Sequence, residues 1–226
     1  MLAYKFRSAS QIEFVFDILL KRRLYCADWR RLNDPMEGMF ASIYREAERP
    51  YVQQVVMGIR DAKRRYNVAS LAGTFDCHLL WAHYAGGFDG VAIELDLPDN
   101  DPMIRPVLYR GVFSPVDIDN LHNEDQAAQA ILFSKYREWS YEREIRILHD
   151  QDYYHLHTPV RRVIAGHRMG EALFDALHLV CDKLRIEVRR VGIGDEGIDA
   201  DQVNAPRLKN YRRRQANGAR AVERVV

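Results

Sequence analysis

The sequence predicts a single α+β domain in which helices flank a mixed, largely antiparallel sheet. Segments in which apolar and polar side chains alternate are interspersed with segments of helical period, without the strict alternation of a parallel α/β fold. The chain has 226 residues, and its hydrophobic content of 47% is enough to bury one complete core. From about Asp195, Gly, Asp and Asn replace core residues, so we expect the domain to span 1–194 and a polar, basic tail to span 195–226.

The first half of the chain mixes strand-like and helix-like segments. Ser8 or Ser10 is placed to cap the first helix, and Pro50 either breaks the long second helix or opens its second part. A loop at 33–38 is rich in residues that form turns. We expect strands at 2–7, 24–27, 66–75 and 90–96, and helices at 11–21, 39–65 and 79–85.

The second half continues this mixture. Pro106 cannot donate a ladder hydrogen bond, so a strand at 104–113 is expected to lie at a sheet edge or to contain a bulge. Further strands or extended segments are expected at 142–148, 153–165 and 185–193, and helices at 124–136 and 171–184.

Charge and cysteine content exclude several classes of protein. The 33 basic and 32 acidic residues nearly cancel, so no overall field favours nucleic acid or an anionic membrane. Three cysteines without a Cys-x-x-Cys pair indicate neither a disulfide framework nor a structural zinc site. Glu13 and Asp17 interrupt the apolar residues near the start, and no segment is long and apolar enough for a bilayer. We expect a soluble, cytoplasmic protein without membrane contacts.

The segment Trp139-Ser-Tyr-Glu142-Arg-Glu144-Ile-Arg146 carries the strongest chemical signal. On a strand, Glu142, Glu144 and Arg146 point to the same side, and carboxylates two residues apart lie roughly 6.5–7 Å from each other. Such a pair couples its titrations when water is excluded. The alternative is a solvated strand face whose charge Arg146 balances.

Two other predicted strands have a similar pattern. Lys5 and Arg7 alternate with apolar side chains on the first strand, and Glu94 and Asp96 do so on the strand 90–96. If these strands are neighbours of the strand with Glu144, their charged faces form a cleft suited to a polar, partly anionic small molecule. The alternative is an exposed face of an antiparallel sheet.

Two short segments are candidate walls of such a cleft. Trp81, His83 and Tyr84 precede a Gly-Gly turn and either form a mobile aromatic wall or pack in the core. Asn33 and Asp34 either contact a ligand or form a simple Asx turn, with Glu37 exposed. No Walker loop, dinucleotide-binding glycine fingerprint or nucleophile elbow is present.

Six short segments, taken in order, form a pattern that is typical of one protein family. They are Tyr4-Lys-Phe-Arg7-Ser8, Asn33-Asp34-Pro35-Met-Glu37, Trp81-Ala-His83-Tyr84-Ala85, Gly90-Val-Ala-Ile-Glu94, Val107-Leu-Tyr109 and Lys135 with Trp139 to Arg146. Through them the chain resembles the bacterial domain of unknown function 2971 (DUF2971) family over 2–191. Met36 stands where a phenylalanine is common, and Phe88 or Asp89 takes the place of a frequent histidine. The family is largely uncharacterised, so the resemblance implies no reaction, although it implies a setting of bacterial stress or phage defence.

Arg7, Ser70 and Glu142-Arg-Glu144 are also similar in order to the motif of ADP-ribosyltransferases of the arginine–serine–glutamate type. This resemblance implies that NAD is the donor and that Arg7 holds its pyrophosphate or ribose. It implies that Glu144 stabilises an oxocarbenium-like ribose through the 2′-hydroxyl, while Glu142 orients or deprotonates the acceptor. Ser134 or Ser140 are alternatives for the serine.

Three hypotheses follow for the function. The first is a nucleotide-handling enzyme with catalytic Arg7, Glu142 and Glu144, no metal ion, and a nucleic acid or protein as possible acceptor. The second is a nuclease whose magnesium ions bind Glu142, Glu144, Glu94 and Asp96. The third is a non-catalytic module of a defence system that binds a ligand or partner. The basic cluster at 207–214 is either a solvated terminus or a contact for nucleic-acid phosphates, and the sequence does not define the oligomeric state.

Overall fold

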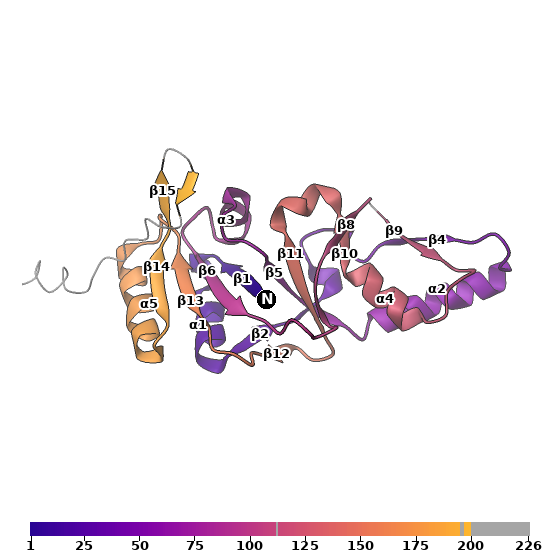
Figure 1. The fold of residues 1–226 in the computed structure, drawn as a ribbon, viewed down its shortest axis with the longest axis horizontal. Coiled ribbons are helices and arrows are strands. Elements are labelled where there is room, and N and C mark those ends of the chain that lie inside the picture. The colour runs from indigo at the N-terminus through magenta and orange to yellow at the C-terminus, as the bar shows by residue number, and fades with distance from the viewer. Residues whose placement is uncertain (112, 195–196, 200–226) are drawn as a thin grey trace, which may run out of the picture.

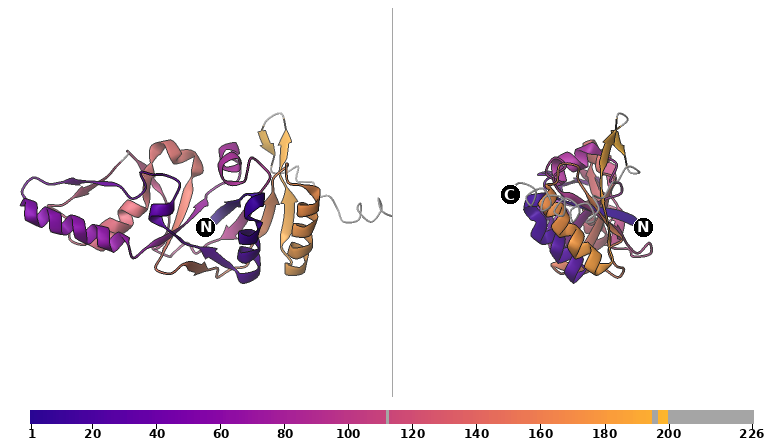
Figure 2. Two further views of the ribbon diagram at one scale, coloured as in Figure 1. Left: turned by 180° about the vertical axis from the view of Figure 1, so that it is seen from behind. Right: turned by 90° about the vertical axis from the view of Figure 1, so that its left-hand side faces the viewer.

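The computed structural model describes residues 1–111, 113–194 and 197–199 and confirms the α+β fold class. A central mixed sheet carries helices on both faces, and the molecule is elongated, with an arm that extends from one end of the sheet (Figures 1 and 2). Within the described residues, none of the helices combines the length and apolar character that a bilayer crossing requires. Apart from 197–199, the predicted tail at 195–226 lies outside the described residues.

The central sheet has eight strands and is mostly antiparallel. The parallel pair consists of β13 and β14 at one edge, and β7, which contains Pro106, forms the opposite edge as the sequence predicted. In spatial order the strands are β14 (Glu187–Arg190), β13 (Arg162–Ala165), β6 (Val91–Asp96), β1 (Leu2–Arg7), β5 (Asn67–Ala72), β11 (Glu144–His149) and β7 (Ile104–Pro106), with β3 (Ala27–Asp28) also paired to β5.

Helices α1 (Ile12–Lys21) and α5 (Glu171–Leu184) cover one face of this sheet. Their apolar stripes, which include Ile18 and Phe174, join inward strand residues such as Ile93 in the largest hydrophobic cluster. The short helix α3 (His78–Tyr84) packs on the other face, where Leu80 and Trp81 contact Tyr4 and Phe6 of β1. The observed bounds of all three helices agree closely with the predicted ones.

The arm has a small hydrophobic cluster of its own. Helices α2 (Arg49–Lys63) and α4 (Glu124–Leu132) pack against each other and against a parallel pair of strands, β4 (Phe40–Ile43) and β9 (Ser114–Asp117). The predicted helix at 39–65 is therefore wrong in its first part, where β4 forms. Side chains of β4 alternate in burial because β9 pairs with it, and this partner is distant in sequence. Pro50 lies in the first turn of α2, so it opens the second part.

Other predicted elements also differ in their bounds, and the predicted strand at 104–113 is divided into Ile104–Pro106 and Leu108–Arg110. The predicted helix at 124–136 ends at Leu132, and β10 (Ser134–Tyr136) then pairs with β8 (Leu108–Arg110). The residues before β11 form a 3₁₀ helix, Arg137–Glu142, so Glu142 precedes the strand instead of lying on it. The remaining short pairs are β2 (Arg23–Tyr25) with β12 (Tyr153–His155), and β15 (Gly192–Gly194) with β16 (Gly197–Asp199).

The sheet opens between β1 and β5. Six residues of β1 pair with β6, whereas its pairing with β5 is confined to Tyr4 opposite Ala72. Beyond this point the two strands diverge, and the Lys5 ammonium donates a hydrogen bond of 2.7 Å to the Ser70 carbonyl oxygen. A side chain thus replaces a ladder hydrogen bond, and the gap gives access to the centre of the sheet.

Candidate functional site

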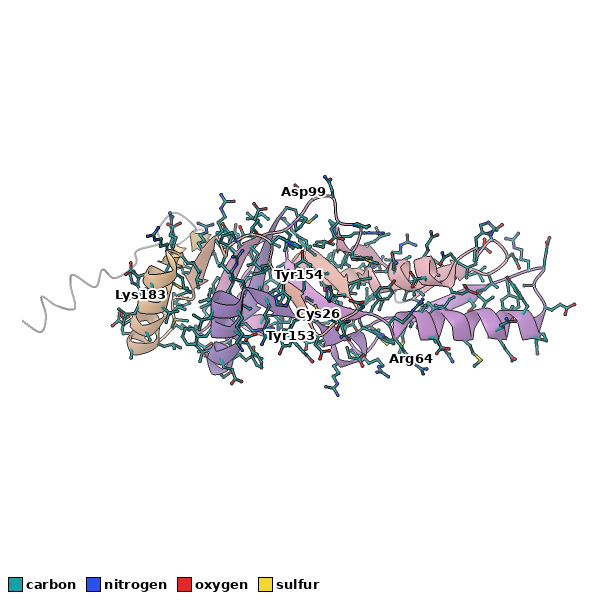
Figure 3. All side chains as sticks on the ribbon, turned by 90° about the horizontal axis from the view of Figure 1, so that it is seen from below. Cys26, Arg64, Asp99, Tyr153, Tyr154 and Lys183 are labelled. Atoms are coloured by element: carbon teal, nitrogen blue, oxygen red, sulfur yellow. The ribbon has the colours of Figure 1, made fainter. Side chains whose placement is uncertain are left out.

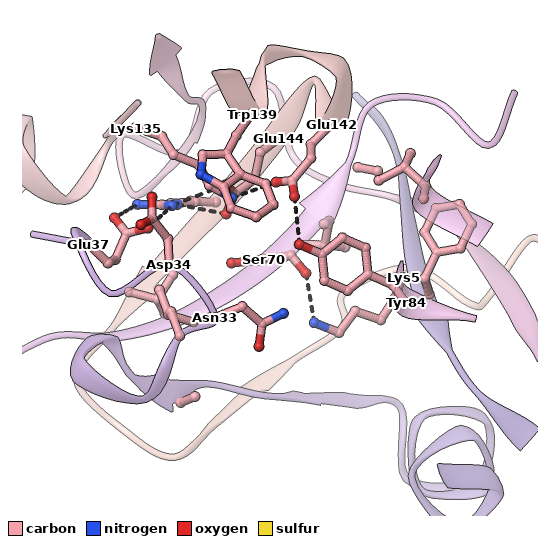
Figure 4. Close-up of a pocket in the computed structure, with 18 of the residues that line it drawn as sticks. Lys5, Asn33, Asp34, Glu37, Ser70, Tyr84, Lys135, Trp139, Glu142 and Glu144 are labelled. Atoms are coloured by element: carbon pink, nitrogen blue, oxygen red, sulfur yellow. Dashed lines mark hydrogen bonds and ion pairs between the residues drawn. The ribbon is translucent and has the colours of Figure 1, made fainter. Parts of the chain in front are cut away.

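A cavity of about 210 Å³ lies at the gap between β1 and β5 (Figure 4). Strands β1, β5 and β11 form its walls together with α3, the 3₁₀ helix before β11 and the loop after β3. The side chains that line it and are used below are Lys5, Arg7, Asn33, Asp34, Glu37, Ser70, Tyr84, Lys135, Trp139, Glu142, Glu144 and Arg146.

One end of the cavity holds a chain of buried ion pairs. The Lys135 ammonium donates to Glu142 at 2.5 Å and to Glu144 at 3.0 Å. The Arg146 guanidinium donates to both oxygens of Glu144, at 2.7 and 3.1 Å, and to both oxygens of Glu37, at 2.6 and 2.7 Å. Arg146 is fully buried, and the three carboxylates are at most 7% exposed. The interpretation as a solvated strand face is therefore wrong, because these groups are shielded from bulk water.

These contacts shift the pKa values of the buried groups in different directions. Burial alone would raise the pKa of Glu144, but the charges of Arg146 and Lys135 outweigh it and hold the pKa at about 2. Burial would lower the pKa of Lys135, yet Glu144 and Glu142 raise it. Burial raises the pKa of Glu37 by more than the charge of Arg146 lowers it, so this pKa lies above its ordinary value. Glu144 and Lys135 consequently stay charged at neutral pH.

Aromatic side chains position the two acidic catalytic candidates, Glu142 and Glu144. The Tyr84 hydroxyl donates to Glu142 at 2.6 Å, and its pKa is raised by burial and by this carboxylate. The Tyr109 hydroxyl accepts the backbone N–H of Glu144 at 2.7 Å. The ring of Trp139 lies over the Lys135 ammonium, 5.0 Å from it, and forms part of the cavity wall. Glu142 and Glu144 are thus fixed by several contacts before any ligand is bound.

The opposite end of the cavity carries two basic side chains that have no carboxylate partner in the described part of the chain. Within 1–111, 113–194 and 197–199, no carboxylate lies within ion-pair distance of Lys5 or Arg7. The Arg7 Nε is buried and has no hydrogen-bond partner among these residues. Burial lowers the pKa of the Arg7 guanidinium. Burial, together with the nearby charge of Arg7, lowers the pKa of the Lys5 ammonium well below its ordinary value. A bound anion would remove this penalty.

Most of the predicted site residues line this cavity. Arg7, Ser70 and Glu144 come from the neighbouring strands β1, β5 and β11, and Tyr84 comes from α3. The others that the cavity brings together are Glu142, Arg146, Asn33 and Asp34. Ser70 and Asn33 face the charged network. A hydrogen bond from the Ser70 hydroxyl helps to lower the pKa of Glu144. A hydrogen bond with Asn33 partly opposes the rise in the pKa of Tyr84.

Trp81, His83 and Glu94 lie elsewhere. Trp81 is fully buried, donates to the Phe75 carbonyl oxygen at 2.8 Å and packs in the core, which is the alternative that the sequence left open. His83 lies in the same helix but does not line the cavity. Glu94 is buried and accepts from Arg162 at 2.7 Å and pairs with Arg161 at 3.2 Å.

The predicted common charged face is wrong for Lys5 and Arg7. Antiparallel register places Glu94 opposite Tyr4, Tyr4 opposite Ala72 and Ala72 opposite Glu144, so Glu94 and Glu144 lie on the same face of the sheet. Lys5 lies opposite Ile93, so Lys5 and Arg7 point to the other face and line the cavity only because β1 and β5 diverge there. Asp96 is exposed near the end of the same strand. Within the described residues, no group of three or more His, Cys, Asp or Glu side chains is arranged to hold a metal ion. The four carboxylates of the nuclease hypothesis are not brought together.

The sequence alone did not identify Lys135, Trp139 or Glu37 as site residues, whereas Lys5 was expected on a charged strand face of the cleft. Lys135 and Trp139 belong to the segment that carries the family resemblance, and this was the available signal for them. Glu37 was expected to be exposed, but it is 7% exposed because Arg146 holds it. The spacing gave no sign of this pair, since the two residues are 109 positions apart.

The fold and the site define an α+β domain with an internal cavity that has a network of ion pairs at one end and, at the other, two basic side chains without a carboxylate partner among the described residues. Comparisons with protein-family models, with curated proteins and with solved structures gave no match for this chain. Membership of the DUF2971 family thus stays a prediction.

Proposed function

We propose that the protein is a nucleotide-handling enzyme of the ADP-ribosyltransferase type, with NAD as its donor substrate and a role in bacterial stress or phage defence. One observation carries the proposal. Arg7, Ser70 and Glu144, separated by more than sixty residues at each step, line one cavity from three neighbouring strands. Their order in the sheet is the order in which the motif occurs in the chain.

The cationic end of the cavity supports an anionic substrate. Arg7 always carries its charge and presents a buried Nε that is unpartnered within the described residues. A pyrophosphate would supply an acceptor for the Arg7 Nε and negative charge beside Lys5, through charge-assisted hydrogen bonds. The residues present therefore fit the group that the proposal requires.

The acidic end supports the transfer of a ribosyl group. When the bond between the ribose C1′ and the nicotinamide nitrogen breaks, its electron pair leaves with nicotinamide and positive charge develops on the sugar. Glu144, whose pKa of about 2 keeps it ionised, stabilises that charge from a fixed position. Glu142 takes the proton of the acceptor nucleophile as the new bond to C1′ forms. Lys135 and Tyr84 hold Glu142 in place for this step.

The size of the cavity limits how the substrate binds. At about 210 Å³ it is smaller than the roughly 300–1,000 Å³ of typical small-molecule sites. We therefore propose that it encloses only the reacting part of the dinucleotide. Tyr25 and Arg31 lie at the exposed margin of the cavity and are available to the remainder.

The test is incubation of the purified protein with NAD, with and without cell extract, followed by mass spectrometry for nicotinamide and ADP-ribose adducts. Arg7→Met and Glu142→Gln are expected to abolish nicotinamide release, whereas Arg49→Met, which changes an exposed arginine on α2, is the matched control. Arg7 is preferred to Glu144 as a probe because its removal leaves no carboxylate unpaired. No release from the wild type under any condition would contradict the proposal, and NAD that binds unchanged would favour the non-catalytic module.

A further inference from the structure

A second cavity of about 390 Å³ lies where the arm joins the sheet. Trp29, Phe40 and the exposed Phe113 form its aromatic walls, and Lys63 and Arg60 reach it from α2. The loop that contains Asp34 and Glu37 separates it from the first cavity, since these two residues line both. The proposed transferase site makes no use of this second cavity.

Lys63 is an unusual residue for such a place because it is only 4% exposed. Its ammonium donates to the Gly38 carbonyl oxygen at 2.6 Å and lies 4.4 Å from the Trp29 ring centre and 5.1 Å from that of Phe40. Across the residues that the structure describes, no carboxylate comes within ion-pair distance of it, Asp34 and Glu37 included. A buried lysine is normally paired with an acid.

Other groups around the cavity also favour an anion. The Trp29 Nε1 is buried and, within the described ranges, has no acceptor. Arg60 adds positive charge, and burial together with this charge lowers the pKa of Lys63 to about 8. The amine is still mostly protonated at neutral pH. Of the two acids on the wall, Glu37 is held by Arg146, and Asp34 accepts the backbone N–H of Met36.

We propose that this second cavity binds a nucleoside monophosphate, a ligand that joins a planar base to an anionic phosphate group. The anionic group accepts from Lys63, and the ring packs between Phe40 and Phe113. Burial of a ring between aromatic walls supplies the affinity, while the ammonium supplies selectivity for negative charge. This site is independent of the proposed transferase activity, which uses the first cavity.

The experiment is calorimetric titration of the full chain with AMP, adenosine and inorganic phosphate. AMP is expected to bind more tightly than either fragment, because it alone offers both the ring and the anion. Lys63→Met is expected to weaken AMP binding by about tenfold or more, to the level of adenosine. The matched control is Lys183→Met on α5, an exposed lysine that lies far from Arg64, the residue after Lys63 (Figure 3).

Two further variants test which cavity binds AMP and whether its base contacts Phe113. Phe113→Ala changes a half-exposed side chain, so the fold is retained, and it should weaken AMP and adenosine several-fold but leave phosphate unchanged. Arg7→Met reports on the first cavity. Binding of AMP that is lost in Arg7→Met and kept in Lys63→Met would place it in the first cavity and overturn the proposal. Absence of AMP binding to the wild type at millimolar concentration would overturn it as well.

Discussion

Replacing Glu144 by glutamine should destabilise the protein although the side chain keeps its shape. The carboxylate has a pKa of about 2, against 4.5 for an ordinary glutamate, so the folded state prefers the ionised form by about 2.5 pKa units. This difference corresponds to about 3 kcal/mol at neutral pH. Removal of one partner from a buried ion pair typically costs about 3–5 kcal/mol, which agrees in magnitude.

The effect should depend on pH with a definite sign. The folded-state pKa is depressed, so the stabilisation is complete above about pH 5 and is lost as the pH falls towards 2. At pH 7 the melting temperature of Glu144→Gln should be lower than that of the wild type by about 6–12 °C for a domain of this size. At pH 3 the difference in free energy should shrink to roughly half of its value at pH 7, because the ionised form of wild-type Glu144 then stabilises the fold less.

Glu37→Gln is the matched control, since Glu37 contacts the same guanidinium. Burial raises its pKa, so its ionisation opposes folding at neutral pH, and the variant should lose far less stability than Glu144→Gln. The assay is urea unfolding followed by circular dichroism at pH 7 and pH 3. Equal losses in the two variants, or a loss in Glu144→Gln that does not diminish at pH 3, would refute the assignment of opposite pKa shifts.

Three other changes test separate parts of the structure. Gly90→Ala would place a Cβ 2.0 Å from the Arg7 carbonyl oxygen, so it should lower stability by about 1–3 kcal/mol in chemical denaturation; an unchanged midpoint would exclude this close approach. Tyr84→Phe removes the hydrogen bond to Glu142 and should cost about 1 kcal/mol in thermal unfolding while reducing nicotinamide release; normal release would show that Tyr84 does not position Glu142. With a thiol reagent at pH 8, Cys77 should react rapidly and the two buried cysteines slowly, because burial raises their pKa to about 11 and about 12; rapid reaction of all three would contradict their burial.

Local sequence patterns predicted many of the helices and strands. The strand at 2–7 and the helix at 171–184 were predicted within a residue of their observed bounds, because their periodicity and end signals are local. The pattern failed at Phe40–Ile43, which forms a strand through pairing with Ser114–Asp117, more than seventy residues later. A pairing partner at this distance decides the state of a short segment, and no local signal reports it.

The sequence by itself indicated which side chains are candidates for the chemistry, since the motif around Glu144 and the arginine of the first strand could be recognised by residue type and order. Only the tertiary structure decided which charges neutralise one another. It paired Glu37 with Arg146 and placed Glu94 and Lys5 on opposite faces of the sheet. It also left Arg7 without a carboxylate partner among the described residues. The physical reason is that strand register and the divergence of β1 from β5 set these distances, and both depend on the packing of the whole sheet.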